Sequence, residues 1–552
     1  MYADIHCYPA KVAYNTYALT PEKPELLTTR RSTSATSGRN NPKKNIFTEP
    51  SQCDLNKSVQ ARVKLMFAAL YPIEKGFLYG HRSGRINKEV IGEYLIKTVH
   101  EGEKNATMWL SQLLKTIPGL ESIKQNDLVF LRNRYNKFPF EKLISLQNDS
   151  YDYFDELKRE YKFYLSNSSQ NEFVQINSTK EGTYQLARNG SDVLHRLRPD
   201  NNDILIVFTM EGIHALGLGN PEDEFLHPGE MQKDVTIGKL KSRIRQLKGE
   251  ENLDDPVLEK WEHCPFFITF AHHFNNTLCG HAHSLPNLSR HVYDQRKNMD
   301  KGVLKNVTYD VLLELLGLDN ELNSTGSRRI LIDIKHMSAA SRQDFYKKII
   351  RPHNRKPENI LSKIPIIASH VAYSGIDTLD LSIQYSQQGK EEDDFYINGF
   401  KAWNINLCDE DIIEIHDSNG LIGITLDQFL LGSYHHSWLT SFQIQSLEKR
   451  KAKNILARTL EQFIRIPFDY NLTDPMKIWD ILCIGTGFDG VANQLNAYST
   501  VLDLTLLEDD IIQILSRMRR ERPKWFGNQS PENLARKICF ENAYDFVVEH
   551  YR

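Results

Sequence analysis

Six residues that can bind a metal ion or move a proton stand at or just after the ends of short apolar segments. Four are histidines and two are acidic, and together they form the candidate site of this chain. They are His6, Glu211, His272, His336, His370 and Asp489. The clearest pair is His336 and His370, because the chain between their two segments, Ser338 to Ile350, has helical composition and spacing. The unit from Arg329 to Ser374 is therefore predicted to be strand, helix, strand, with a histidine at the end of each strand.

Histidine is the commonest metal ligand, and several histidines with a carboxylate form the nitrogen and oxygen ligand set of zinc or a similar divalent ion. Taken singly, each residue has a plainer interpretation. His6 would serve as a core or helix-capping histidine, and Glu211 would form a structural salt bridge. The joint placement of all these residues at strand ends favours a metal site over separate structural roles.

The segments that carry these residues are eight apolar runs separated mostly by helical stretches. The runs cover residues 2–5, 63–70, 203–210, 265–271, 330–336, 364–370, 420–426 and 479–485. This order predicts an α/β fold, a (β/α)8 TIM barrel of amidohydrolase type with long insertions, in which the carboxyl ends of all the strands meet at one face. A doubly wound open sheet is the alternative, but no strand is followed by a glycine-rich dinucleotide fingerprint, and Gly212 to Gly219 has the wrong spacing.

The 552 residues are interpreted as a single elaborated domain, 1–552, with a polar insertion or disordered loop at 28–58 and a second polar insertion at 377–403. The 68 basic and 71 acidic residues nearly balance, which gives no argument for a nucleic-acid partner or an anionic membrane. The seven cysteines form no disulfide or zinc-knuckle pattern. No apolar run approaches the roughly 20 residues that a membrane span needs, and no signal peptide is evident. We expect a soluble, cytoplasmic protein, with the oligomeric state open and a homodimer possible.

Several segments, in the same order along the chain, resemble motifs of the membrane dipeptidase (renal dipeptidase) family of the amidohydrolase superfamily. Ile332 to Ser338 resembles the family's Ile-Asp-Leu-Ser-His-Val-Ser, and Ile366 to Ser374 resembles Val-Ile-Phe-Ser-His-Ser-Ser-Ala-Tyr-Ser. The other matching segments are residues 4–6, 209–214, 270–276, 485–490 and 541–546. The matches span most of the chain but form islands.

The resemblance implies a binuclear zinc hydrolase that acts on a dipeptide or a related small amide. It assigns His6, Glu211, His336 and His370 to the metal ions and His272 to the substrate. Asp489 is the candidate for proton transfer. Two zinc ions would polarise the carbonyl and lower the pKa of a bound water, which becomes the nucleophile.

Three departures from the family pattern bear on catalysis. Tyr8 stands where the family has a metal-binding aspartate, and Gly487 stands where it has the catalytic aspartate. The family's substrate-binding arginine has no counterpart in residues 375–380. A phenol is a poor ligand at neutral pH, so the number of zinc ions is open between one and two. The second hypothesis is therefore a catalytically impaired barrel that binds a small ligand or a protein partner.

Other candidates have plainer interpretations. His273, His281 and His283 have no carboxylate at ligand spacing, so we interpret them as loop histidines. Cys7 and Cys279 lie near the expected site, but a buried cysteine is usually an inert small hydrophobe.

Overall fold

The computed structural model describes fourteen stretches of the chain. They are residues 1–11, 13–14, 51–79, 151–167, 173–174, 181–218, 234–250, 259–285, 295–304, 306–390, 395–432, 441–490, 494–495 and 497–552. Apolar spacing predicts a helix at 88–116, but that stretch and the part of the first insertion at 28–50 lie outside the described residues. No helix among the described stretches is long and apolar enough to cross a membrane.

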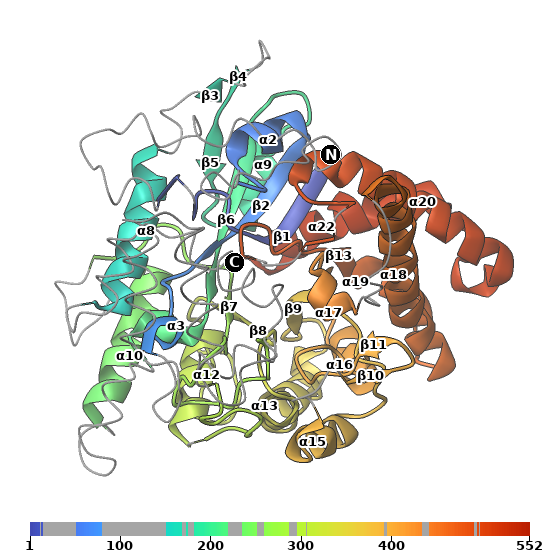
Figure 1. The fold of residues 1–552 in the computed structure, drawn as a ribbon. Coiled ribbons are helices and arrows are strands. Elements are labelled where there is room, and N and C mark those ends of the chain that lie inside the picture. Colours follow the sequence, from blue (N-terminus) through green and yellow to red (C-terminus); the bar gives the residue numbers. More distant parts are fainter. Residues whose placement is uncertain are drawn as a thin grey trace, which may run out of the picture.

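Eight parallel strands form the centre of the molecule (Figure 1). In spatial order they are β1 (Tyr2–Cys7), β2 (Val63–Leu70), β6 (Ile204–Glu211), β7 (Phe267–Thr269), β8 (Leu331–Asp333), β9 (Ile367–Val371), β12 (Leu421–Ile424) and β13 (Leu482–Ile484). The two ends of this sheet meet just beyond β1 and β13, where Gly487 N donates to His6 O at 2.9 Å and Tyr8 N donates to Phe488 O at 3.1 Å. The sheet is thus a nearly closed (β/α)8 TIM barrel, and the predicted fold class is confirmed.

All eight predicted strands are present because each is apolar enough to be buried on both faces, as a parallel strand under helices must be. Every residue of β2 and β6 is buried. The strand predicted at 479–485 is shorter than expected, because residues 478–481 form the helical turn α19 (Ile478–Ile481) after a 3-10 turn that begins at Pro475. The Asn542 amide donates to Trp479 O and Leu482 O, each at 2.7 Å, and so binds this turn to the start of β13.

Helices surround the barrel, with α8 and α10 on one side and α18 and α20 on the other (Figure 1). The longer ones are α8 (Tyr153–Asn167), α10 (Asp234–Lys248), α12 (Val307–Leu316), α15 (Leu379–Gln387), α16 (Asp409–Asp417), α18 (Ser441–Asp469), α20 (Leu504–Glu521) and α22 (Asn542–His550). The shorter ones are α2 (Leu55–Gln60), α3 (Gly76–Tyr79), α9 (Gly190–Arg196), α13 (Ala339–Phe345), α14 (Arg351–Asn354), α17 (Gln428–Leu431) and α21 (Pro531–Arg536). Capping residues in the sequence mark where several of these helices begin. For example, the Ser338 hydroxyl accepts from Ser341 N at 3.0 Å and caps the start of α13.

Both predicted insertions contain regular structure where they are described. Within 28–58, Asp54 caps α2 by accepting from Lys57 N at 3.1 Å. Within 377–403, Thr378 caps α15, and a hairpin of β10 (Tyr396–Ile397) and β11 (Phe400–Lys401) follows. Three further short strands are β3 (Phe173–Val174), β4 (Glu181–Gly182) and β5 (Tyr184–Leu186), of which β5 pairs in parallel with β6.

Candidate metal centre

One carboxylate oxygen lies among four histidines at the carboxyl ends of the strands. Glu211 Oε1 is 3.4 Å from Nε2 of His6 and of His272, and 3.8 Å from Nε2 of His336 and of His370. All five side chains are buried. The structure thus brings together five of the six residues singled out in the sequence.

The barrel itself aims these groups at one another. Glu211 is in register with Thr269 on β7, and Thr269 with Asp333 on β8, so the three side chains point to the same side of the sheet. His336 follows three residues after β8 ends and has a positive φ of 65°. This left-handed backbone is uncommon for a residue with a side chain, and such conformations gather at functional sites.

A hydrogen-bond relay fixes the ring of His370. The Ser369 hydroxyl lies 2.6 Å from Asp333 Oδ2 and 2.8 Å from His370 Nδ1. Because the hydroxyl gives its one proton to Asp333, Nδ1 of His370 must be the donor to Ser369. The Nε2 atom of His370 then carries the lone pair and faces Glu211, which is the state that a metal ligand needs.

Asp4 supports the opposite side of the site in a similar way. Its Oδ1 accepts from His6 N at 3.1 Å and from Thr486 N at 3.0 Å, while Oδ2 accepts from the Thr486 hydroxyl at 2.5 Å. These bonds hold the end of β1 against the segment after β13. Burial raises the pKa of Asp4 to about 6, although these hydrogen bonds oppose the shift.

A second carboxylate, Glu74, was not singled out in the sequence. It lies between β2 and α3, where it accepts a short hydrogen bond from His272 Nδ1 through Oε2 and one of 3.1 Å from Phe274 N through Oε1. His272 thus stands between Glu74 and Glu211. No motif carries this glutamate, and only the folded loop after β2 shows its position.

His272 differs from His336 and His370 in its protonation state. Burial disfavours its cation, but Glu211 and Glu74 outweigh burial and raise the pKa of His272 to about 9. For Glu211 burial likewise favours the neutral acid, yet the neighbouring His272 and His6 hold the pKa of the carboxyl well below its usual range. Burial lowers the pKa of His336 and of His370 well below the usual value, so both rings are neutral.

Two groups of side chains have ligand atoms within 4.8 Å of one another. One is His6, Glu211 and His370, and the other is His272, His273 and His336. Three buried ring nitrogens have no hydrogen-bond partner in the described part of the chain: Nδ1 and Nε2 of His6, and Nδ1 of His336. Buried polar atoms rarely stay unsatisfied, and neutral imidazoles with a carboxylate suit zinc, so the residues present fit a metal ion.

His273 belongs to this group although the sequence suggested a loop histidine. Its ring lies 4.9 Å from that of His336, and its Nδ1 is 2.7 Å from the Ser284 hydroxyl. His281 and His283 make other contacts, with Gln295 O at 2.9 Å and with the Trp403 ring at 4.3 Å, respectively.

The two cysteines near the site are buried. Burial raises the pKa of Cys7 and of Cys279 to about 12, so neither is a thiolate at neutral pH.

The positions that depart from the family pattern have their own contacts. The Tyr8 ring packs edge-on to His6, with centroids 5.3 Å apart, and Lys11 Nζ lies 4.3 Å above it. Gly490 lies against the same ring, since a Cβ there would be 2.2 Å from Tyr8 Cε2. Gly487 has a φ of 70°, and its N–H donates to His6 O.

Asp489 uses its carboxylate to hold a neighbouring loop. It accepts from the Ser51 hydroxyl at 2.5 Å, from Gln52 N at 2.9 Å and from Cys53 N at 3.3 Å. Its φ is 64°, a turn conformation that aspartate tolerates better than most residues. These contacts describe a residue that organises a turn, and the proton-transfer role of Asp489 stays a prediction.

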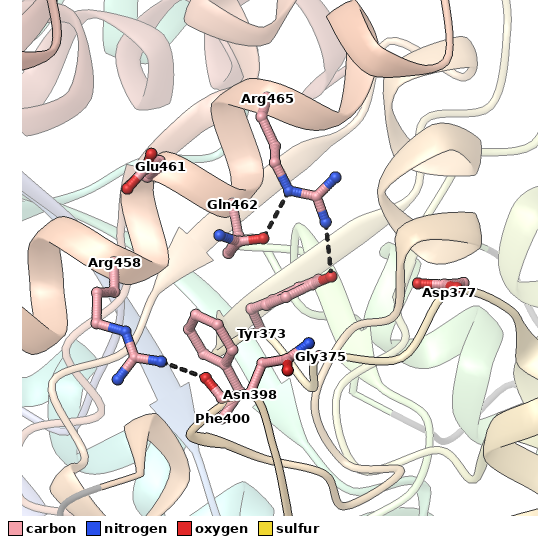
Figure 2. A pocket seen from close by; sticks show the side chains of 9 residues that line it. All are labelled: Tyr373, Gly375, Asp377, Asn398, Phe400, Arg458, Glu461, Gln462 and Arg465. Atoms are coloured by element: carbon pink, nitrogen blue, oxygen red, sulfur yellow. Dashed lines mark hydrogen bonds between the residues drawn. The ribbon is translucent and has the colours of Figure 1, made fainter. Parts of the chain in front are cut away.

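A separate cavity of about 240 Å³ lies between α18, the β10–β11 hairpin and the loop after β9 (Figure 2). Arg465 Nη2 donates to the Tyr373 hydroxyl at 3.1 Å, and Arg458 donates to Asn398 O. None of the histidines of the candidate metal centre lines this cavity.

Comparison with known proteins adds little at the level of sequence. No protein-family model matches the chain, and no curated protein is significantly similar to it. Solved structures align over nearly the whole chain at low similarity. The dipeptidase AC, a metallo peptidase of family M19, is 12% identical, covers 100% of this chain and 98% of its own, and has a TM-score of 0.44.

Two further structures align in the same way. A metallo peptidase from Rhodobacter sphaeroides, liganded with a phosphinate mimic of the dipeptide L-Ala-D-Ala, is 12% identical over 100% of this chain and 99% of its own, with a TM-score of 0.44. The probable dipeptidase PvdM from Pseudomonas aeruginosa is 14% identical over 98% and 99%, with a TM-score of 0.38.

Proposed function

We propose that this chain is a metal-dependent hydrolase, resembling membrane dipeptidase, that cleaves a peptide or amide bond in a small dipeptide-like substrate. The observation that carries the proposal is the position of Glu211 Oε1, within 3.8 Å of four histidine Nε2 atoms at the carboxyl ends of the barrel strands. That face of a TIM barrel is where active sites are built.

In this proposal the metal ligands are His6, Glu211, His336 and His370. The relay through Ser369 leaves the Nε2 lone pair of His370 free, and low pKa values keep His336 and His370 neutral. A zinc ion bound there supplies a Lewis acid and lowers the pKa of a bound water. One ion fits the group of His6, Glu211 and His370, and the number of ions is left to metal analysis.

His272 has a different part in the proposal. Glu74 and Glu211 favour its protonated form, and an imidazolium has no lone pair with which to bind a metal. It therefore serves as a hydrogen-bond donor to the substrate carbonyl oxygen, where negative charge develops in the transition state. Glu74 is the residue that positions this donor.

The proton-transfer role of Asp489 belongs to the same proposal. It requires that Asp489 give up its bonds to Ser51 and Gln52 when substrate is bound. If it carries the proton, Asp489→Asn lowers kcat by about 10²–10⁴-fold at an unchanged zinc content. A kcat within threefold of the wild-type value would restrict Asp489 to the turn.

The test is metal analysis of protein purified without chelator, combined with a dipeptide panel. We expect one or two equivalents of zinc per chain and measurable hydrolysis that His336→Ala abolishes. The matched control His416→Ala changes a buried histidine of α16, whose Nε2 bonds to Asp474 O at 2.7 Å, and should keep both zinc and turnover. Protein without zinc and without turnover would refute the proposal.

A catalytically impaired barrel that binds a small ligand or a protein partner is the second candidate. It is favoured by Gly487, which offers no side chain, and by Asp489, whose carboxylate is occupied. Zinc bound at full occupancy without turnover of any dipeptide in the panel would support this candidate instead.

A further inference from the structure

One buried lysine beside the histidines has no partner. Lys335 follows β8 and is 1% exposed, and its Nζ has no hydrogen-bond partner and no ion pair within 4.0 Å in the described part of the chain. Two other buried lysines, Lys248 and Lys57, have partners. Lys248 donates to Glu314 O and to the Ser327 hydroxyl, the latter at 2.9 Å, and Lys57 pairs with Asp54 at 2.7 Å.

Lys335 lies beside the candidate metal centre, just beyond the end of β8. Asp333 stands in the same row as Thr269 and Glu211, and the bond of 2.7 Å from the Thr269 hydroxyl to Asp333 Oδ2 shows that these side chains share a side. Lys335 is two residues further along, in the turn after β8, and its ammonium group is close enough to Glu211, His336 and His370 to interact electrostatically with all three.

Charged groups among the described residues lie around the ammonium group of Lys335, but none of them forms an ion pair with it. Burial lowers the pKa of Lys335 to about 8, while Asp427, Asp333 and Glu211 oppose this shift, and none of these three carboxylates is within ion-pair distance of Nζ in the described part of the chain. The carboxylate oxygens of Asp333 accept hydrogen bonds from the Ser369 and Thr269 hydroxyls and from backbone N–H groups. The neighbouring acids therefore offset the charge without occupying its donors.

An ammonium group buried without an acceptor is costly, and such groups in native proteins mark a ligand or a functional site. We propose that Lys335 binds a carboxylate group of a small ligand held beside the histidines. A carboxylate carries the single negative charge that one ammonium balances, whereas a phosphate dianion would add repulsion from Glu211 and Asp427. The inference rests on the proposed function because it places the ligand at the same site, but its test measures binding and does not require hydrolysis.

Binding of two probes of nearly the same size tests the inference without catalysis. N-acetylglycine carries a carboxylate, and N-acetylglycinamide has a neutral amide in its place. Titration calorimetry on the full-length protein, purified without chelator, gives the ratio of their affinities. We expect the wild type to favour N-acetylglycine by roughly tenfold or more, and Lys335→Met to remove that preference with its zinc content unchanged.

The control is Lys248→Met, which removes a buried lysine that has partners. It should keep the preference and lower Tm, whereas Lys335→Met should raise Tm or leave it unchanged, because it removes an unpaired buried charge. A preference for N-acetylglycine that survives in Lys335→Met would overturn the inference. So would loss of zinc from that variant, or competition by inorganic phosphate as strong as that by N-acetylglycine.

The outcomes also separate this inference from the proposed function. A wild-type protein that hydrolyses no dipeptide but shows the Lys335-dependent preference would refute the hydrolase and support the inference. Hydrolysis of dipeptides and of their C-terminal amides with equal kcat/KM, in wild type and Lys335→Met alike, would overturn the inference alone.

Discussion

Replacing Glu211 with glutamine tests the arrangement of the site most directly. The change keeps the size of the side chain and removes its charge. Glu211 Oε1 is 3.4 Å from His272 Nε2, and at an effective dielectric constant of about 20 two unit charges at that distance attract by about 5 kcal/mol. Since one pKa unit is about 1.4 kcal/mol, loss of the charge should lower the pKa of His272 by on the order of three units.

The first readout is therefore the protonation of His272 in Glu211→Gln. We expect its pKa to fall from about 9 to near or below its ordinary value, so that the ring is charged at pH 8 in the wild type and neutral in the variant. Imidazole NMR of chelator-treated protein, recorded over a pH series, measures this directly. The second readout is the zinc affinity, measured in competition with a chelator. It should fall by more than the 10–100-fold that is typical when a residue that only positions a metal ligand is lost.

Glu314→Gln is the matched control for this experiment. Glu314 is a partly buried glutamate of α12 that accepts from Arg245 Nε at 3.0 Å, and it takes no part in the candidate site. Neither readout should change in this variant. If Glu211→Gln retained zinc within threefold of the wild-type affinity, and His272 stayed protonated at pH 8, the central role assigned to Glu211 would be wrong.

Three further predictions concern the support of the site and of the barrel. Ser369→Ala removes the partner of His370 Nδ1, so zinc affinity should fall about 10–100-fold while Tm changes little, and an unchanged affinity would argue against the relay. Because the folded-state pKa of His272 is raised to about 9, its contribution to stability is full below about pH 6.5 and is lost as pH rises through 9. Urea unfolding of chelator-treated protein should therefore show a decrease in unfolding free energy on the order of 3 kcal/mol over this range, and an unfolding free energy that does not change with pH would contradict the prediction. Asp411→Asn breaks the buried pair in which Arg342 Nε and Nη2 donate at 2.9 and 2.8 Å, which should cost about 3–5 kcal/mol of unfolding free energy, and a Tm equal to that of the wild type would refute the estimate.

The barrel could be predicted because its strands carry a strong local signal. A parallel strand covered on both faces must be continuously apolar, and the run 63–70 matches β2 (Val63–Leu70) residue for residue. The polar residue that ends such a run breaks the apolar pattern, so strand-end histidines could be found from the chain alone. The signal fails at 479–481, where apolar residues begin a helical turn, since short apolar runs do not distinguish the two conformations.

The rest of the candidate site depends on contacts between distant segments. Glu74 reaches His272 across 198 positions of the chain, and nothing in its own neighbourhood marks it. His273 has no carboxylate at ligand spacing and joins His336 only because two loops meet. Lys335 stands between Ile334 and His336, and only its burial without a partner distinguishes it from a surface lysine.

The departures from the family pattern are connected in the structure. The Tyr8 ring fills space beside His6, and Gly490 lies so close to it that any side chain there would clash. Asp489, the residue before Gly490, binds the same turn to residues 51–53. Gly487, three residues before Gly490, takes a left-handed conformation and donates its N–H to the end of β1. A carboxylate introduced at position 8 alone would replace a packed ring by a smaller buried charge beside this turn, and position 487 would still have no side chain. The turn and the ring therefore form one packing arrangement, and a single substitution at position 8 or 487 should not by itself add both a metal ligand and a proton carrier.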